Sequence, residues 1–170
     1  MTAEAGNLTT SLKEVNVAMN MIDMLMQEHQ EAASMMEQIE NAGAGDASVM
    51  TTFNQLKQAL MMHMQAEEQL FYPALRNNDE TGDQIGESFE EHQEVKDLLA
   101  EMSGLQAGNE EFMSMMSDLK ESVEHHVEEE ENELFPKARK ILGESRLEEM
   151  GQQMRQMKQG KSATATQTRR

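Results

Sequence analysis

Two stretches of the chain, "HMQAEEQLFYP" at residues 63–73 and "HVEEEENELFP" at residues 126–136, share one pattern. In each, a histidine is followed four residues later by a glutamate, then by a second glutamate, two large apolar residues and a proline. The whole chain of 170 residues has only five histidines and two prolines. A histidine and a glutamate four residues apart lie on one face of an α-helix, about one turn apart. The repetition therefore indicates two helices that use the same pair of side chains.

The repeat extends beyond these two stretches. A shift of 63 residues places "EHQEA" at residues 28–32 on "EHQEV" at residues 91–95, and it places His63 on His126. Two similar helical hairpins therefore follow one another, and we expect an approximate two-fold axis between them. Duplication of a stable hairpin can produce such symmetry without a site, so the repeat alone assigns no function.

Apolar residues recur at helical spacing through most of the chain, and Gly- and Asn-rich segments separate them. The loop signals are "NAGAGD" at residues 41–46, "NNDETGD" at 77–83, "GLQAGN" at 104–109, and Gly143. We expect helices near residues 20–41, 48–76, 83–103 and 109–142, and a shorter helix near 144–159. Long helices with short connections predict an all-α fold, an up-down-up-down four-helix bundle with a short extra C-terminal helix.

This pattern predicts one domain with less ordered ends. We expect a flexible segment at residues 1–19, the four-helix bundle at 20–142, a short helical segment at 143–160 and a disordered basic tail at 161–170.

Composition excludes several classes of site and partner. The chain has no cysteine, which rules out disulfides, thiolate catalysis and iron–sulfur clusters. Its net charge is −18, and the segment through Pro136 carries 29 acidic and five basic residues. Such a body attracts cations and repels nucleic acid and anionic membranes, so neither is expected as a partner. Without a signal peptide or a membrane-spanning run at the start, a cytoplasmic location is expected.

Each of the four long helices places one histidine on its apolar face; in the third, His92 shares this face with Ile85, Phe89 and Val95. Two of the helices add a carboxylate one turn later. Burying imidazoles and carboxylates without partners is costly, and two buried carboxylates repel each other. Two divalent or trivalent metal ions remove both problems if each takes two imidazoles and both glutamates bridge them. The predicted metal ligands are His29, His63, Glu67, His92, His126 and Glu130.

Simpler interpretations exist for each motif alone. A single core histidine is more often only hydrogen-bonded, and a single His-Glu pair is commonly a solvated helix pair. Four histidines in repeat register favour the metal site over both. We expect His125 at the surface or behind the ligands. For Tyr72, an interfacial position at a helix end is favoured over a place beside the site, where it would tune or gate it. The run Glu128–Glu131 is expected on a solvated face except for Glu130, and the prolines are expected to bend their helices.

Two other metal-site classes do not fit the spacing. A ferritin-like diiron site needs a glutamate three residues before a histidine, and this chain has Met26, Leu60 and Phe89 at the positions before His29, His63 and His92. The HExxH motif of zinc hydrolases is also absent, so a hydrolase is not expected.

The chain resembles the hemerythrin-like (HHE cation-binding) family over about residues 20–142. The likeness rests on His29, "HMQAEEQLFYP", "EEHQEV" and "HVEEEENELFP". The resemblance implies a four-helix bundle that holds a non-haem diiron centre with an oxo or hydroxo bridge. Carried over by position, it implies the same six ligands as above. Histidine and carboxylate ligands also accept manganese or zinc.

One departure from the family's oxygen carriers affects the expected function. They have a fifth histidine four residues from the one on the third helix, whereas here those positions are Ser88 and Lys96. Two five-coordinate irons with open positions are then expected. The resemblance implies a protein that binds O2, NO or peroxide in sensing or in a redox or stress response.

The alternatives come from other classes. One is an iron storage or donor protein that serves iron homeostasis or iron-centre repair, with an iron acceptor or redox partner. Another is a metal-free interaction bundle, which would leave the buried polar residues unpaired. If the protein is an enzyme, a peroxide- or NO-handling oxidoreductase is the expectation.

Overall fold

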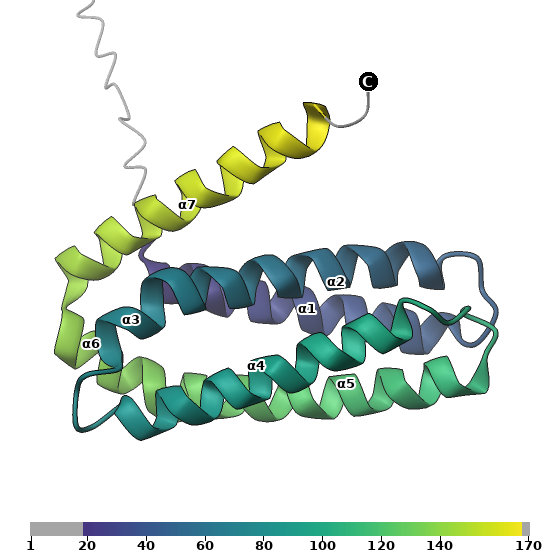
Figure 1. Ribbon diagram of the computed structural model, residues 1–170, viewed down its shortest axis with the longest axis horizontal. Helices are drawn as coiled ribbons and strands as arrows, with labels where there is room; N and C mark the ends of the chain where they lie inside the picture. The colour runs from purple at the N-terminus through teal and green to yellow at the C-terminus, as the bar shows by residue number, and fades with distance from the viewer. Residues whose placement is uncertain (1–18, 168–170) are drawn as a thin grey trace, which may run out of the picture.

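The computed structural model describes residues 19–167, and their side chains through residue 160. Every regular element in this part of the chain is helical, which confirms the all-α bundle (Figure 1). The elements are α1 (Met21–Ala42), α2 (Val49–Ala66), η1 (Glu67–Phe71), α3 (Tyr72–Leu75), α4 (Gly82–Met102), α5 (Glu110–Glu129), η2 (Glu130–Leu134), α6 (Phe135–Leu142) and α7 (Glu144–Gln167).

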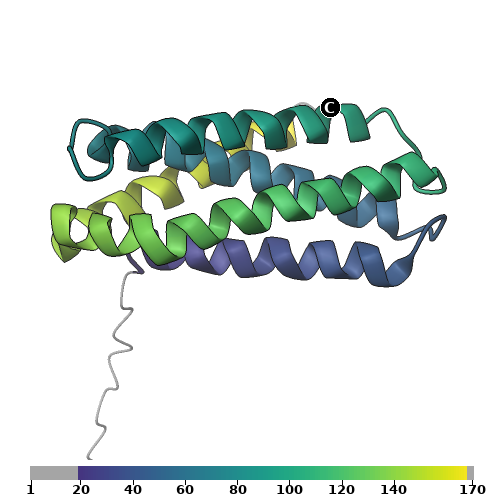
Figure 2. The same ribbon diagram turned by 90° about the horizontal axis from the view of Figure 1, so that it is seen from below.

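Four helices lie side by side and alternate in direction, as Figures 1 and 2 show for α1, α2, α4 and α5. The connections from α1 to α2 and from α4 to α5 lie at one end of the bundle, and α3 and α6 lie at the other. Helix α2 continues through η1 into α3, and α5 continues through η2 into α6. The expected up-down-up-down order is therefore present.

Local sequence signals fix the helix ends. The side chain of Asn20 accepts a hydrogen bond from the backbone N–H of Asp23 (3.0 Å) and so caps the start of α1. Asn109 caps α5 in the same way through the N–H of Glu111 (2.9 Å). Gly43 follows α1 with φ of 76°, a backbone conformation that glycine adopts without the steric cost of a Cβ.

The core has two apolar clusters, with the predicted site residues between them. The first cluster includes Phe53 and Phe112, whose rings meet edge to face with centroids 5.1 Å apart. The second includes Phe71, Tyr72 and Phe135 at the opposite end. Along each long helix, the histidine falls between residues of the first cluster and residues of the second. The polar groups are therefore held between two dry layers of the bundle.

Some expectations about the helices were wrong. The expected helices at 48–76 and 109–142 each contain a π-helical turn, η1 and η2. Phe89 was expected in the core, but it is 39% exposed and packs edge-on against Tyr72. The last helix does not end near residue 159. It continues to Gln167 and so includes residues that were expected to be disordered. The segment expected to be flexible, 1–19, lies almost entirely outside the described residues.

Helix α7 crosses the bundle at an angle and packs on the start of α1 (Figure 1). Leu147, Met150 and Met154 are its buried contacts. At Gly151 the two helices touch backbone to backbone, because a Cβ there would lie 2.6 Å from the carbonyl oxygen of Met19. This close packing fixes the position of the next two turns of α7. No helix in the described part of the chain is long and apolar enough to cross a membrane.

Candidate metal centre

Each π-helical turn begins at one of the two predicted glutamate ligands. In η1 the N–H of Tyr72 bonds to the carbonyl of Glu67, and in η2 the N–H of Phe135 bonds to that of Glu130. A π turn holds one more residue than an α turn, and such turns are frequent at functional sites. Pro73 and Pro136 follow directly. Since proline has no N–H and its ring collides with the carbonyl four residues earlier, the wider turn accommodates it.

The π turn also explains why Tyr72 was placed wrongly. In a regular α-helix, nine residues separate Tyr72 from His63 by about 180° of rotation, which would put the ring on the outer face. The extra residue in η1 rotates Tyr72 inward instead, where it is fully buried. Tyr72 is therefore a residue of the site and not an interfacial tyrosine.

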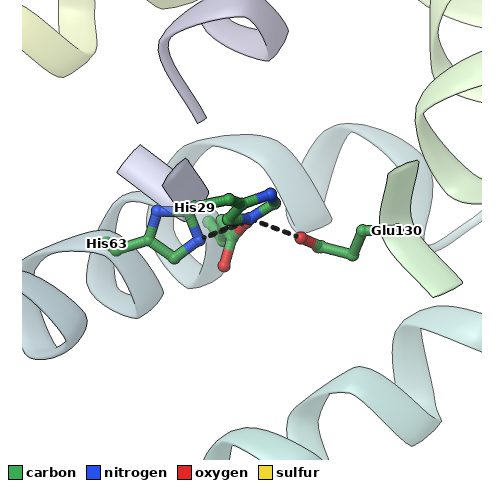
Figure 3. Close-up of side chains that lie close together, drawn as sticks. His29, His63 and Glu130 are labelled. Atoms are coloured by element: carbon green, nitrogen blue, oxygen red, sulfur yellow. Dashed lines mark hydrogen bonds and ion pairs between the residues drawn. The ribbon is translucent and has the colours of Figure 1, made fainter. Parts of the chain in front are cut away.

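The six residues predicted as ligands lie together in the centre of the bundle. His29 and His63 bring their Nε2 atoms to 3.1 Å, and His92 and His126 do the same at 3.1 Å. Figure 3 shows His29, His63 and Glu130 pointing toward one another from separate helices. All six side chains are buried.

Each of the two inner glutamates touches both pairs of histidines. The carboxylate of Glu67 lies 3.1 Å from Nε2 of His63 and 3.2 Å from Nε2 of His92. The carboxylate of Glu130 lies 3.4 Å from Nε2 of His29 and 3.6 Å from Nε2 of His126. Both carboxylates therefore lie between the pairs, as bridging groups must.

An outer glutamate binds the other ring nitrogen of every one of these histidines. The Nδ1···O distances are 2.8 Å for His29–Glu131, 2.9 Å for His63–Glu28, 2.9 Å for His92–Glu68 and 2.6 Å for His126–Glu91. A carboxylate only accepts hydrogen bonds, so the proton of each neutral imidazole is on Nδ1. The Nε2 atoms then present lone pairs to the centre. Carboxylate–histidine pairs of this kind orient imidazoles that bind metal ions.

The centre consequently collects acceptor atoms that have no donor. Both oxygens of Glu67 and Oε2 of Glu130 are buried without a hydrogen bond to any described residue. Buried polar atoms are nearly always paired, and an unpaired carboxylate is costly. Positive charge, either protons on the imidazoles or metal ions, satisfies lone pairs that face one another in this way. The residues present therefore fit a metal centre.

The pKa values of His126 and Glu67 are both shifted in the direction that favours positive charge in the centre. Burial alone would lower the pKa of His126, but the carboxylates of Glu130 and Glu91 outweigh it and raise that pKa to about 9. Burial alone would raise the pKa of Glu67, but His63 and His92 hold it well below its usual range. The field that favours a proton here also favours a metal cation.

The two halves of the site differ at the position of Tyr72. Tyr72 and Phe135 correspond under the shift of 63 residues. The hydroxyl of Tyr72 donates to Oε1 of Glu130 (2.8 Å) and lies 3.2 Å from Nε2 of His92. Phe135 instead stacks on His29, with ring centroids 5.8 Å apart and planes 6° from parallel. Among the described residues, a tyrosine hydroxyl therefore lies beside the His92 half and a phenyl ring beside the His29 half.

A cavity of about 150 Å³ opens onto the four imidazoles. Most of its wall comes from α1 and α2, with the remainder from α4, α5 and Lys158 of α7. Apolar side chains such as Leu60, Met64 and Val123 form much of the lining. The cavity has room for a molecule of a few atoms beside the centre.

Sequence reasoning missed the outer glutamates. Glu131 was placed on a solvated face, but it is bound to His29. The repeat carried a usable signal, since Glu28 corresponds to Glu91 and Glu68 to Glu131 under the same shift as the histidines. His125 is 64% exposed at its side chain and lies 3.7 Å from Glu91, at the surface as expected.

The sequence is similar to two curated proteins. A protein of Nostoc sp. named a DNA nickase is 27% identical over 77% of this chain, and an uncharacterised hemerythrin-like protein of Schizosaccharomyces pombe is 29% identical over 72%. The matches span 37% and 61% of those relatives, less than two thirds of either.

The fold has a counterpart among solved structures. The crystal structure of a hemerythrin HHE cation binding domain-containing protein from Mycobacterium kansasii matches with a TM-score of 0.76 at 24% identity, covering 89% of this chain and 93% of the other. That likeness bears on the fold. The model of the hemerythrin HHE cation binding domain matches residues 20–138, and the chain therefore belongs to the hemerythrin family of HHE cation-binding domains.

Proposed function

We propose that this chain holds two iron ions and binds O2, NO or peroxide at them, in sensing or in a redox or stress response. His29 and His63 would bind one ion, His92 and His126 the other, and Glu67 and Glu130 would bridge the two. The observation that carries the proposal is the convergence of imidazole and carboxylate lone pairs without donors. Manganese and zinc accept the same ligands, so metal analysis is the first test.

The chain's own residues prepare this centre for small ligands. The outer glutamates fix the tautomer and the orientation of each imidazole. The apolar clusters on either side keep bulk water away, and the cavity leaves space beside the imidazoles. When bound, the iron pair supplies electrons and Lewis acidity that no side chain here can provide.

The direct test is to purify the full chain aerobically, measure its metal content and record its optical spectrum. We expect two irons per chain and near-ultraviolet absorption bands of a coupled ferric pair. After reduction, exposure to O2 or to NO should change the spectrum. At most one tightly bound ion per chain would contradict the dinuclear site. A spectrum that does not change with either gas would contradict gas binding but not the metal site.

A second candidate, an iron reservoir or donor, is favoured by an acidic groove outside the site. The groove has a volume of about 670 Å³ and runs over α4 and α5. Glu91 lines it and also binds Nδ1 of His126 (2.6 Å). A cation in the groove would thus be one carboxylate away from the centre. Loss of iron to a mild chelator within minutes would favour this candidate, and retention for hours would favour the first.

The Tyr72 hydroxyl allows a test of the asymmetry between the two halves. Tyr72→Phe keeps the buried ring but leaves Oε1 of Glu130 without its donor. We expect two irons to remain and the optical bands to shift. We also expect the metal-free protein to lose about 1–3 kcal/mol in free energy of unfolding, because a buried acceptor becomes unsatisfied. Urea denaturation and absorption spectra measure both effects, and an unchanged spectrum together with unchanged stability would contradict this role.

A further inference from the structure

Helix α7 brings a lysine to the cavity beside the centre. Lys158 lines this cavity and forms an ion pair with Glu28, whose other oxygen binds Nδ1 of His63. The lysine is held there because Gly151 and the buried Met154 fix α7 on the start of α1. The internal repeat ends before α7, and among the described residues the other half of the site has no equivalent of this helix.

The charges around the cavity give Lys158 a specific consequence. Glu28 and Glu31 also line the cavity, and among its described lining residues Lys158 is the only lysine or arginine. Without Lys158, an anion entering a protein of net charge −18 would meet two carboxylates at this point. The ammonium group of Lys158 offsets the charge of these carboxylates and so lowers the electrostatic barrier to an entering anion, since clefts lined by one sign of charge select ligands by charge.

We propose that Lys158 determines which ligands enter this cavity, and that it admits small monovalent anions to the His29/His63 side of the metal centre. The inference rests on the proposed metal centre. It adds small anions as a class of ligand, and the cavity beside Lys158 as their route to the centre. The side is assigned because most of the cavity wall comes from α1 and α2, which carry His29 and His63. Neutral diatomic molecules use the same apolar cavity without needing the lysine.

The chain contains a matched control for this residue. Lys96 pairs with Glu68 (2.7 Å), and Glu68 binds Nδ1 of His92 (2.9 Å), so the lysine–glutamate–histidine arrangement occurs twice. The lysine side chains are similarly exposed, 28% for Lys96 and 23% for Lys158. Lys96, however, does not line the cavity. If removing a lysine acts through its glutamate on the histidine, substitutions of Lys96 and of Lys158 should have the same effect. If it acts through the charge of the cavity, only substitution of Lys158 should have an effect.

The experiment uses the iron-loaded full chain and azide as the probe anion. Azide is titrated at constant ionic strength into the ferric wild type, Lys158→Gln, Lys158→Arg and Lys96→Gln, and its affinity is read from the optical bands. We expect azide to bind Lys158→Gln about five-fold more weakly, the size of effect that one partly exposed charge has. Lys158→Arg should restore the affinity, and Lys96→Gln should stay near wild type. The affinity of the reduced protein for NO, a neutral ligand, should not change in Lys158→Gln.

The outcomes separate this inference from the metal centre itself. Iron content and the wild-type spectrum test the centre before any variant is compared. If the wild type holds two irons and binds azide, equal affinities in wild type and Lys158→Gln overturn the role of Lys158 alone. Equal weakening in Lys158→Gln and Lys96→Gln also overturns it, and so does a parallel loss of NO affinity or of iron in Lys158→Gln. Selective weakening for azide, with rescue by arginine, supports it.

Discussion

His126→Ala is expected to lower the iron content from two ions per chain to one or none and to abolish the optical bands of the coupled pair. His126 brings Nε2 to 3.1 Å from that of His92 and to 3.6 Å from Glu130. Its loss leaves one imidazole for the second ion. Losing only an outer partner of a ligand costs about 10- to 100-fold in metal affinity, and losing the ligand itself should cost more. His63→Ala should behave alike, because the repeat places it at the equivalent position.

His125→Ala is the control for this prediction, since it removes the adjacent histidine of the same helix. The His125 side chain is 64% exposed and its nearest acidic partners, Glu129 and Glu91, lie 3.4 and 3.7 Å away. We expect it to keep two irons and the full spectrum. Iron analysis and absorption spectra of the two variants give the comparison. If instead His125→Ala lost the irons and His126→Ala kept them, the assignment of His126 to the centre would be wrong.

The helical core could be predicted because the signals for it are local and repeated. Helical spacing places His29, His63, His92 and His126 on apolar faces, and the shift of 63 residues fixes their common register. The structure places all four in the interior with Glu67 and Glu130. The direction of each side chain around its own helix follows from its position in the helical period, so the sequence alone predicts that these residues face the interior.

The π turns could not be predicted in this way. One extra residue in η1 rotates everything after it, which moves Tyr72 from the expected outer face into the site. Helical spacing in a sequence assumes the same rotation at every residue, so it does not predict a π turn. The proline after each glutamate was the available signal, but it indicated a bend and not a change of rotation.

The outer glutamates were missed for a different reason. Glu28 is adjacent to His29 in sequence, yet it binds His63 on the next helix, and Glu131 binds His29 across the bundle. Such pairs depend on how helices pack, which spacing along one helix does not contain. The position of Lys158 is of the same kind, because it depends on the close contact at Gly151.

The metal-free protein is expected to lose stability as the pH rises from about 6.5 to 9. The pKa of His126 is raised from 6.5 to about 9 in the folded chain, since the carboxylates of Glu130 and Glu91 outweigh the effect of burial. A raised pKa contributes stability that is fully present below 6.5 and is gone above about 9. Because one pKa unit corresponds to about 1.4 kcal/mol, the loss from this group should be about 3 kcal/mol.

Urea denaturation of metal-free protein at a series of pH values measures this loss, and variants isolate its source. Metal-free His125→Ala should follow the wild-type curve, whereas metal-free His126→Ala should lack the part that His126 contributes. Titrating groups that do not touch His126 act in all three proteins and cancel in the comparison. A flat wild-type curve, or the same slope in His126→Ala, would contradict the prediction. The expected result means that protons and metal ions compete for the same lone pairs, so metal uptake should become more favourable over the pH range in which the metal-free fold weakens.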